Sequence, residues 1–179
     1  DDDPAGTDEP GRLAIVRPDS PLMWFPGYVD DPARTAERYT ADGRLYLTGD
    51  VARRTPSGAF AFSSRDDDVI LMAGYRIGPL EVESAMMGHP AVAAAAAIGV
   101  PDEMRGEVVE AYVVLRDDAE RTEGLEHEIA QVVKTEYAAH AYPRRVHIVD
   151  ELPTTASGKI QRNVLRDRHR GQAPADEPG

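Results

Sequence analysis

The spacing of apolar residues divides the chain into short predicted strands and helices. Residues 12–17 have a short apolar core, while residues 42–54 and 57–65 alternate apolar and polar side chains after D-G and S-G turn signals. Alternation with a period of two is typical of half-buried strands. The first third of the chain is therefore predicted to be β-rich, with the two alternating stretches forming a hairpin or meander.

Beyond this segment the pattern changes to strands that alternate with helices. Leu80, Glu83 and Met87 have helical spacing within residues 79–87, and apolar residues recur in the same way over residues 125–138. A terminal helix is predicted at 160–170, a strand or tight hairpin at 69–78, and single strands at 91–100, 107–115 and 145–149. This order predicts an α+β fold, with a small C-terminal domain in which helices flank a short three-stranded sheet.

The aspartate run Asp66, Asp67 and Asp68 separates the two patterns. Three consecutive carboxylates repel one another and resist burial, which predicts an exposed connector. We therefore place a domain boundary at Asp67. Residues 1–66 are then a β-rich segment that starts with an acidic tail, residues 67–170 are the small domain, and residues 171–179 are a second tail.

Composition excludes several classes of function. The 179 residues carry a formal net charge of −12, which argues against nucleic acid and against a polybasic membrane surface. There are no cysteines, so disulfides, cysteine-ligated zinc and thiol catalysis are excluded. No apolar run is long enough to span a bilayer, and no signal-peptide pattern is recognisable. We expect a cytoplasmic protein without nucleic-acid or membrane partners.

Two stretches carry residues suited to nucleotide binding. In YLTGD, Gly49 permits a close ligand approach and Asp50 offers two acceptor oxygens for ribose hydroxyls. A turn with a solvated carboxylate explains the same residues. In AGYRIG, Gly74 and Gly78 bracket a hairpin tip where Arg76 could meet a phosphate, or simply lie in water.

The stretch LPTTASGKIQR contains Lys159, which with Lys134 makes up the two lysines among 20 basic residues. It is not a phosphate loop, because Pro153 stands where that motif needs Gly and Ile160 where it needs Ser or Thr. A lysine on a loop can instead approach one developing negative charge and then leave. That behaviour would stabilise a transition state.

Taken in order, YLTGD, RDDDVI, GYRIGPLEVE and LPTTASGKIQR resemble the carboxy-terminal part of the adenylate-forming enzymes. This superfamily comprises acyl-CoA synthetases, nonribosomal adenylation domains and luciferases. The resemblance extends from about Gly11 to Arg170. The stretches AGYRIGPLEVESAMMGHPAV, MRGEVVEAYVVL and AYPRRVHIVDELPTTASGKIQR are most similar to the medium-chain and acetyl-CoA synthetase branch.

The resemblance implies a role for each matching residue. Asp50 and Arg65 would bind the adenylate ribose, Arg76 would face phosphate, and Asp67 would be the hinge on which the small domain rotates. Lys159 would bridge the carboxylate substrate and the ATP phosphate during adenylation. The CoA-binding residues would be Ala73, Gly74 and Tyr75 along the pantetheine tunnel, and Arg105, Lys134, Tyr142, Pro143 and Arg144 around the nucleotide.

The implied function is that of an acyl-CoA synthetase, which uses ATP and CoA to convert a small carboxylic acid into an acyl-CoA. The phosphate loop, the acid that holds Mg²⁺ and the acyl pocket would belong to an upstream large domain, so this chain is not expected to adenylate an acid by itself. Ser64 also stands where the family has Gly. Two alternatives remain: a carrier-protein-loading adenylation domain, against which Arg105 and Arg144 weigh, and a non-catalytic docking or regulatory module.

Overall fold

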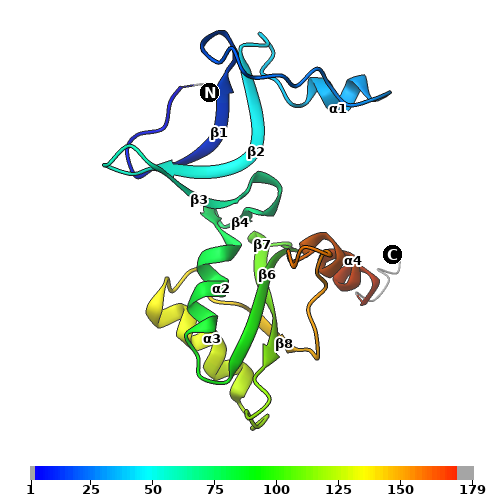
Figure 1. The fold of residues 1–179 in the computed structure, drawn as a ribbon. Helices are drawn as coiled ribbons and strands as arrows, with labels where there is room; N and C mark the ends of the chain where they lie inside the picture. Colours follow the sequence, from blue (N-terminus) through cyan, green and yellow to red (C-terminus); the bar gives the residue numbers. More distant parts are fainter. Residues whose placement is uncertain (1–2, 173–179) are drawn as a thin grey trace. The chain divides into compact units, whose positions relative to one another are not determined.

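The computed structural model describes residues 3–172 and divides the chain between Asp67 and Asp68 into two units. Each unit contains its own β-sheet (Figure 1). Within residues 3–172, no helix is both long and apolar enough to cross a lipid bilayer.

The first unit is built on a three-stranded antiparallel sheet. The strands are β1 (Pro10–Val16), β2 (Leu45–Arg54) and β3 (Phe60–Arg65), which pair in the order β1-β2-β3 (Figure 1). The short helices η1 (Arg17–Asp19) and α1 (Pro32–Ala36) lie between β1 and β2. β2 and β3 fall in the two stretches of alternating apolar and polar residues, and β1 includes the apolar core of residues 12–16.

Aromatic side chains hold the loop that precedes β2. The ring of Phe25 lies 5.2 Å from that of Tyr46 and 6.3 Å from that of Tyr39, measured between centroids. The Tyr39 hydroxyl also donates a hydrogen bond to the Phe25 carbonyl at 2.9 Å. Trp24 is 85% exposed, so the loop is held through Phe25 and not through the tryptophan.

The second unit alternates strands and helices, as the sequence predicts. After the 3-10 turn η2 (Asp66–Asp68), its elements are β4 (Ile70–Met72), β5 (Tyr75–Ile77), α2 (Pro79–Met87), β6 (Val92–Asp102), β7 (Gly106–Leu115), α3 (Leu125–Glu136), β8 (Arg145–Ile148) and α4 (Arg162–Gln172). The helix α4 includes the first two residues of the predicted C-terminal tail, and residues 173–179 lie outside the described residues.

The sheet of this unit has five strands, where the sequence predicts three. β6 pairs antiparallel with β7, and β8 pairs parallel with β7 on its other edge. The β4–β5 hairpin joins the sheet because Met72 pairs with Gly106 and the Ala73 N–H donates to the Arg105 carbonyl at 2.8 Å. The resulting order is β5-β4-β7-β6, with β8 beside β7. The predicted α+β class is confirmed.

Different helices cover the two faces of this sheet. Figure 1 shows α2 and α3 on one face and α4 on the other. Because successive side chains of a strand point to opposite faces, Val109, Ala111 and Val113 enter the apolar core under α2 and α3. Glu110 and Tyr112 point toward the α4 face, and both are also buried. β7 therefore carries polar groups into the layer beneath α4.

Helix α2 buries a different face from the one its sequence predicts. Leu80 and Met87 are 36% and 51% exposed, while Val82 and Met86 are fully buried. Glu83 is also buried, at 4% exposed, because Arg162 of α4 pairs with its carboxylate. Of the three residues predicted to face the core, Leu80, Glu83 and Met87, only Glu83 is buried.

Candidate functional site

The pairing of β2 with β3 brings Asp50 and Arg65 together. They are direct partners in the strand register, and Arg65 Nη1 donates to Asp50 Oδ1 at 3.0 Å. Arg65 Nε also donates to Asp67 Oδ1 at 3.4 Å. Partial burial lowers the pKa of the Arg65 guanidinium, but the hydrogen bond to Asp50 and the charge of Asp67 outweigh burial and raise it. The two predicted ribose ligands form one charged pair.

Gly49 makes room for this pair. Its backbone is left-handed, with φ of 82°. A Cβ at this position would lie 2.7 Å from Arg65 Nη2 and 3.0 Å from Arg38 Nη1. Any side chain would therefore strain the backbone and displace arginine side chains.

The tip of the β4–β5 hairpin is a turn formed by Ala73 and Gly74. Their φ angles are both positive, 50° and 86°, as in the tight turns that join hairpin strands. A Cβ on Gly74 would meet no atom within 4 Å, so the turn is open to solvent. Tyr75 is 53% exposed and stacks on His140 with ring centroids 4.1 Å apart. Arg76 follows as an exposed residue of β5.

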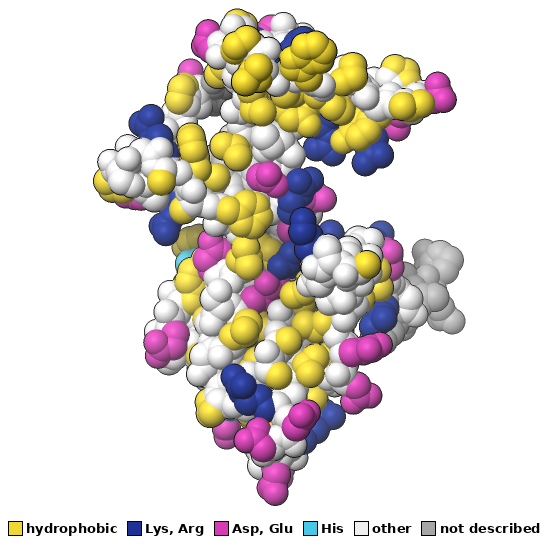
Figure 2. All heavy atoms as spheres, in the orientation of Figure 1, with side chains coloured by type: hydrophobic (Ala, Val, Ile, Leu, Met, Phe, Trp, Pro, Cys, Tyr) yellow, Lys and Arg dark blue, Asp and Glu magenta, His cyan; other side chains and the backbone are white. Residues whose placement is uncertain are grey.

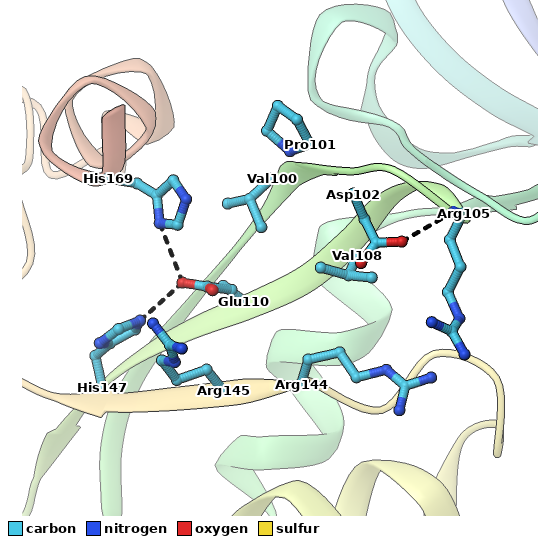
Figure 3. A pocket seen from close by; sticks show the side chains of 10 residues that line it. All are labelled: Val100, Pro101, Asp102, Arg105, Val108, Glu110, Arg144, Arg145, His147 and His169. Carbon is cyan, nitrogen blue, oxygen red and sulfur yellow. Dashed lines mark hydrogen bonds and ion pairs between the residues drawn. The ribbon is translucent and has the colours of Figure 1, made fainter. Parts of the chain in front are cut away.

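Arg105 and Arg144 are far apart in the sequence but line one pocket of about 500 Å³ on the α4 face of the sheet (Figure 3). The carboxylate of Asp102 shapes one wall, since Asp102 Oδ1 accepts the N–H groups of Met104 at 3.0 Å and Arg105 at 2.9 Å. The other lining residues are Val100, Pro101, Val108, Glu110, Arg145, His147 and His169.

Tyr142 holds the side chain of Arg144. Arg144 Nη1 donates to the Tyr142 hydroxyl at 2.6 Å, and the guanidinium carbon lies 4.9 Å from the ring centroid. Pro143 between them is buried, and the Arg144 N–H donates to the Val109 carbonyl at 2.8 Å, which extends the β8 pairing. Lys134 is exposed on α3 and does not line the pocket. Of the residues predicted to bind the nucleotide of CoA, the structure thus brings Arg105, Tyr142, Pro143 and Arg144 together and leaves Lys134 apart.

Lys159 follows a hydrogen-bonded turn of residues 155–158. The Gly158 N–H donates to the Thr155 carbonyl at 2.9 Å, and Gly158 has φ of 81°. The Thr155 N–H donates back to the Lys159 carbonyl at 2.8 Å, and the Thr155 hydroxyl accepts the Lys159 N–H at 3.1 Å. The Lys159 side chain is exposed. The Thr, Ser and Gly residues before the lysine therefore build the turn that presents it.

The pocket also contains residues that sequence reasoning missed. Glu110 Oε2 lies 2.8 Å from His147 Nε2 and 3.2 Å from His169 Nδ1 (Figure 3). Burial raises the pKa of Glu110, but the hydrogen bond from His147 and the charges of His169, His147 and Arg145 outweigh burial and lower it. These side chains come from β7, β8 and α4, so no regular spacing along the chain identifies them.

The pocket can bind an anion, because Arg105, Arg144 and Arg145 all line it. Acidic side chains instead gather at the end of the second unit that carries the β7–α3 connection (Figure 2). That connection contains Asp117, Asp118, Glu120 and Glu123, together with Arg116 and Arg121.

Comparison with known proteins identifies the class of domain. Residues 81–159 match the AMP-binding enzyme C-terminal domain, and the second unit of this chain is such a domain. The chain as a whole is similar to acyl-coenzyme A synthetases. It is 47% identical over 159 residues to the mitochondrial acyl-coenzyme A synthetase ACSM3 of Rattus norvegicus, a match that covers 87% of this chain and 27% of the rat protein.

Solved structures agree with this assignment. The acyl-CoA synthetase of Brucella canis is 46% identical, with a TM-score of 0.59, over 95% of this chain and 30% of that one. The ATP-bound RpMatB-BxBclM chimera B1 is 30% identical, with a TM-score of 0.82, over 95% of this chain and 33% of the other. The chain spans only about 27% of the length of the rat relative. The predicted resemblance to the C-terminal part of an acyl-CoA synthetase is confirmed.

The same comparison contradicts the predicted cytoplasmic location. The rat relative is a mitochondrial protein, and so are matching relatives from mouse and human. A chain without cysteines or long apolar runs is compatible with either compartment, so composition could not distinguish them.

Proposed function

We propose that this chain is the C-terminal part of an AMP-forming acyl-CoA synthetase. Such an acid–thiol ligase converts ATP, CoA and a small carboxylic acid into acyl-CoA, AMP and pyrophosphate. Residues 1–66 end its large domain, residues 67–170 are its mobile C-terminal domain, and Asp67 is the hinge. The upstream large domain supplies the acyl pocket and the ligands of Mg²⁺.

Each unit carries residues to which this proposal assigns a part in adenylation. The Asp50 side chain is 31% exposed while paired with Arg65, so its carboxylate is accessible to ribose hydroxyls. Arg76 is exposed and would contact phosphate. Lys159, presented by its turn, places an ammonium group between the substrate carboxylate and the ATP phosphate and so stabilises the charge that develops there.

The proposed CoA site is supported by three distant parts of the sequence that lie next to one another in the structure. Arg105 and Arg144 line the same pocket, and the Arg105 carbonyl accepts the N–H of Ala73 in the hairpin turn. Pantetheine along Ala73, Gly74 and Tyr75 would therefore lead directly to a nucleotide held at Arg105, Tyr142, Pro143 and Arg144. Lys134 lies outside the pocket and is assigned to CoA only by its position in the sequence.

Calorimetric titration of the 179-residue chain with CoA tests this assignment. Arg105→Ala and Arg144→Ala are each expected to raise the Kd about 5- to 30-fold, which corresponds to about 1–2 kcal/mol for a charge-assisted hydrogen bond. Arg121→Ala is the matched control, because Arg121 is an exposed arginine paired with Glu126 and does not line the pocket. Unchanged CoA binding in both pocket variants would remove the CoA assignment and favour a domain that loads a carrier-protein thiol.

A further inference from the structure

The Glu110 carboxylate organises two histidines in the wall of the pocket. A single oxygen, Oε2, lies within hydrogen-bonding distance of His147 Nε2 and His169 Nδ1. The Glu110 side chain is only 8% exposed, whereas those of His147 and His169 are 25% and 24% exposed. The buried carboxylate thus orients both imidazoles while each keeps an accessible edge.

The second ring nitrogen of each imidazole has no hydrogen-bond partner in the part of the chain that the structure describes. His147 is also fixed in plane, because it stacks on Tyr112 with ring centroids 4.7 Å apart and an interplanar angle of 18°. Tyr112 and His147 are register partners on β7 and β8, so the sheet itself sets this stack. The imidazoles are therefore pre-oriented and have donor capacity to spare.

Charge around the pocket is predominantly positive. Arg105, Arg144 and Arg145 line it, and within residues 3–172 none of the three forms an ion pair with a carboxylate. Asp102 is occupied by backbone N–H groups and Glu110 by the imidazoles. In a chain with a net charge of −12, three arginines around one pocket, none of them in an ion pair within the described residues, point to an anionic ligand.

Protonation of the two imidazoles would change the charge of this pocket. With neutral imidazoles the three lining arginines exceed the two lining carboxylates by one charge, and with both imidazoles protonated they exceed them by three. Histidine is the side chain that ordinarily changes charge between about pH 5 and 8. The other charged or titratable groups that face the cluster are Arg145 on β8, Arg168 on α4 and Tyr112 on β7, and burial raises the pKa of Tyr112 further.

We propose that Arg145, His147 and His169, arranged by Glu110, form a phosphate subsite that binds more strongly when its histidines are protonated. This inference rests on the proposed function, in which Arg105 and Arg144 hold the CoA nucleotide at the same pocket. The subsite takes one phosphate group of that nucleotide. Binding of the nucleotide then depends on pH. The residues responsible, Arg145, His147 and His169, are not among those that the sequence assigned to CoA.

The test is the binding of 3′,5′-adenosine bisphosphate to the 179-residue chain at about pH 6 and pH 8, at constant ionic strength. A phosphate monoester gains a proton near pH 6, so a pocket without titrating groups binds it more weakly at the lower pH. The native chain is expected to show the opposite order, with binding about fivefold tighter at pH 6. The double variant His147→Gln/His169→Gln is expected to bind more weakly at pH 6 than at pH 8. His127→Gln, which changes an exposed histidine of α3, keeps the native order.

A second measurement needs no variant. In a histidine NMR titration, 3′,5′-adenosine bisphosphate is expected to raise the pKa of His147 and His169 and to leave that of His127 unchanged, because binding and protonation are linked. Inorganic phosphate in place of the nucleotide shows whether the phosphate group alone is sufficient. Native binding that weakens on acidification, or imidazole titrations unmoved by ligand, would overturn the subsite. Loss of affinity in Arg105→Ala and Arg144→Ala would still support the CoA assignment in that case.

Discussion

The guanidinium of Arg162 on α4 holds the buried carboxylate of Glu83 on α2. Arg162 Nη2 lies 2.8 Å from each carboxylate oxygen, and Nε lies 3.1 Å from Oε1. Arg162 Nη1 also pairs with Asp68 at 3.2 Å, and Glu83 accepts the Ala97 N–H at 2.8 Å. The network therefore joins the residue that opens the second unit to the helix that follows the Lys159 turn.

Replacing Arg162 with Met is expected to lower the free energy of unfolding by about 3–5 kcal/mol, because Glu83 would stay buried without its charged partner. Urea denaturation of the 179-residue chain measures this change. Arg170→Met on the same helix is the control: Arg170 pairs with Asp167 at 2.7 Å, but the two side chains are 70% and 65% exposed. Its loss should be below about 1 kcal/mol, and equal losses would contradict a structural role for the buried pair.

Glu110 is expected to make the stability of the chain depend on pH. Burial raises the pKa of its carboxyl, but His147, His169 and Arg145 outweigh burial and lower the pKa in the folded chain. A carboxyl with a lowered folded pKa adds stability above its unfolded pKa, and this contribution is lost as the pH falls through the folded value. Urea denaturation should find Glu110→Gln less stable than the native chain at pH 7, and the difference in stability should shrink as the pH falls below the ordinary glutamate pKa of about 4.3. A gap that persists in acid would show that the carboxylate charge is not the cause.

The two lysines are expected to separate the two half-reactions of the complete enzyme. Lys159→Ala should reduce pyrophosphate–ATP exchange on the order of a hundredfold or more, because it removes a charge that acts only during adenylation. Thioester formation from supplied acyl-adenylate should be largely spared. Lys134→Ala should leave the exchange unchanged and raise the KM for CoA. Equal loss of both half-reactions in Lys159→Ala would argue against a domain that rotates between them.

A side chain at Gly74 is expected to block thioester formation. Gly74 has φ of 86° and Gly58 has φ of 85°, and at neither position would a Cβ meet an atom within 4 Å. Leucine at either site should therefore cost a similar strain of about 1–2 kcal/mol. Only Gly74→Leu should slow CoA-dependent thioester formation, while adenylation stays nearly intact in both variants. Equal thioester rates in the two variants would separate this turn from the pantetheine path.

Local sequence determined the elements whose residues interact with near neighbours in the chain. Leu125, Ile129 and Val133 of α3 are buried as their helical spacing predicts, because a helix places residues four apart on one face. Gly49 and Gly74 occupy left-handed backbone positions, the conformation for which glycine is best suited. These features depend on steric rules within a few residues, so the sequence alone contains them.

Tertiary structure decided which polar groups are buried together. The buried carboxylate of Glu83 on α2 is paired with Arg162, which is 79 positions away in the sequence. The β4–β5 hairpin enlarges the sheet only because Met72 meets Gly106, and Glu110 meets His147 and His169 only where β7, β8 and α4 adjoin. The burial of a charge is determined by the partner that compensates its desolvation, and strand pairing and helix packing bring that partner from a distant part of the chain.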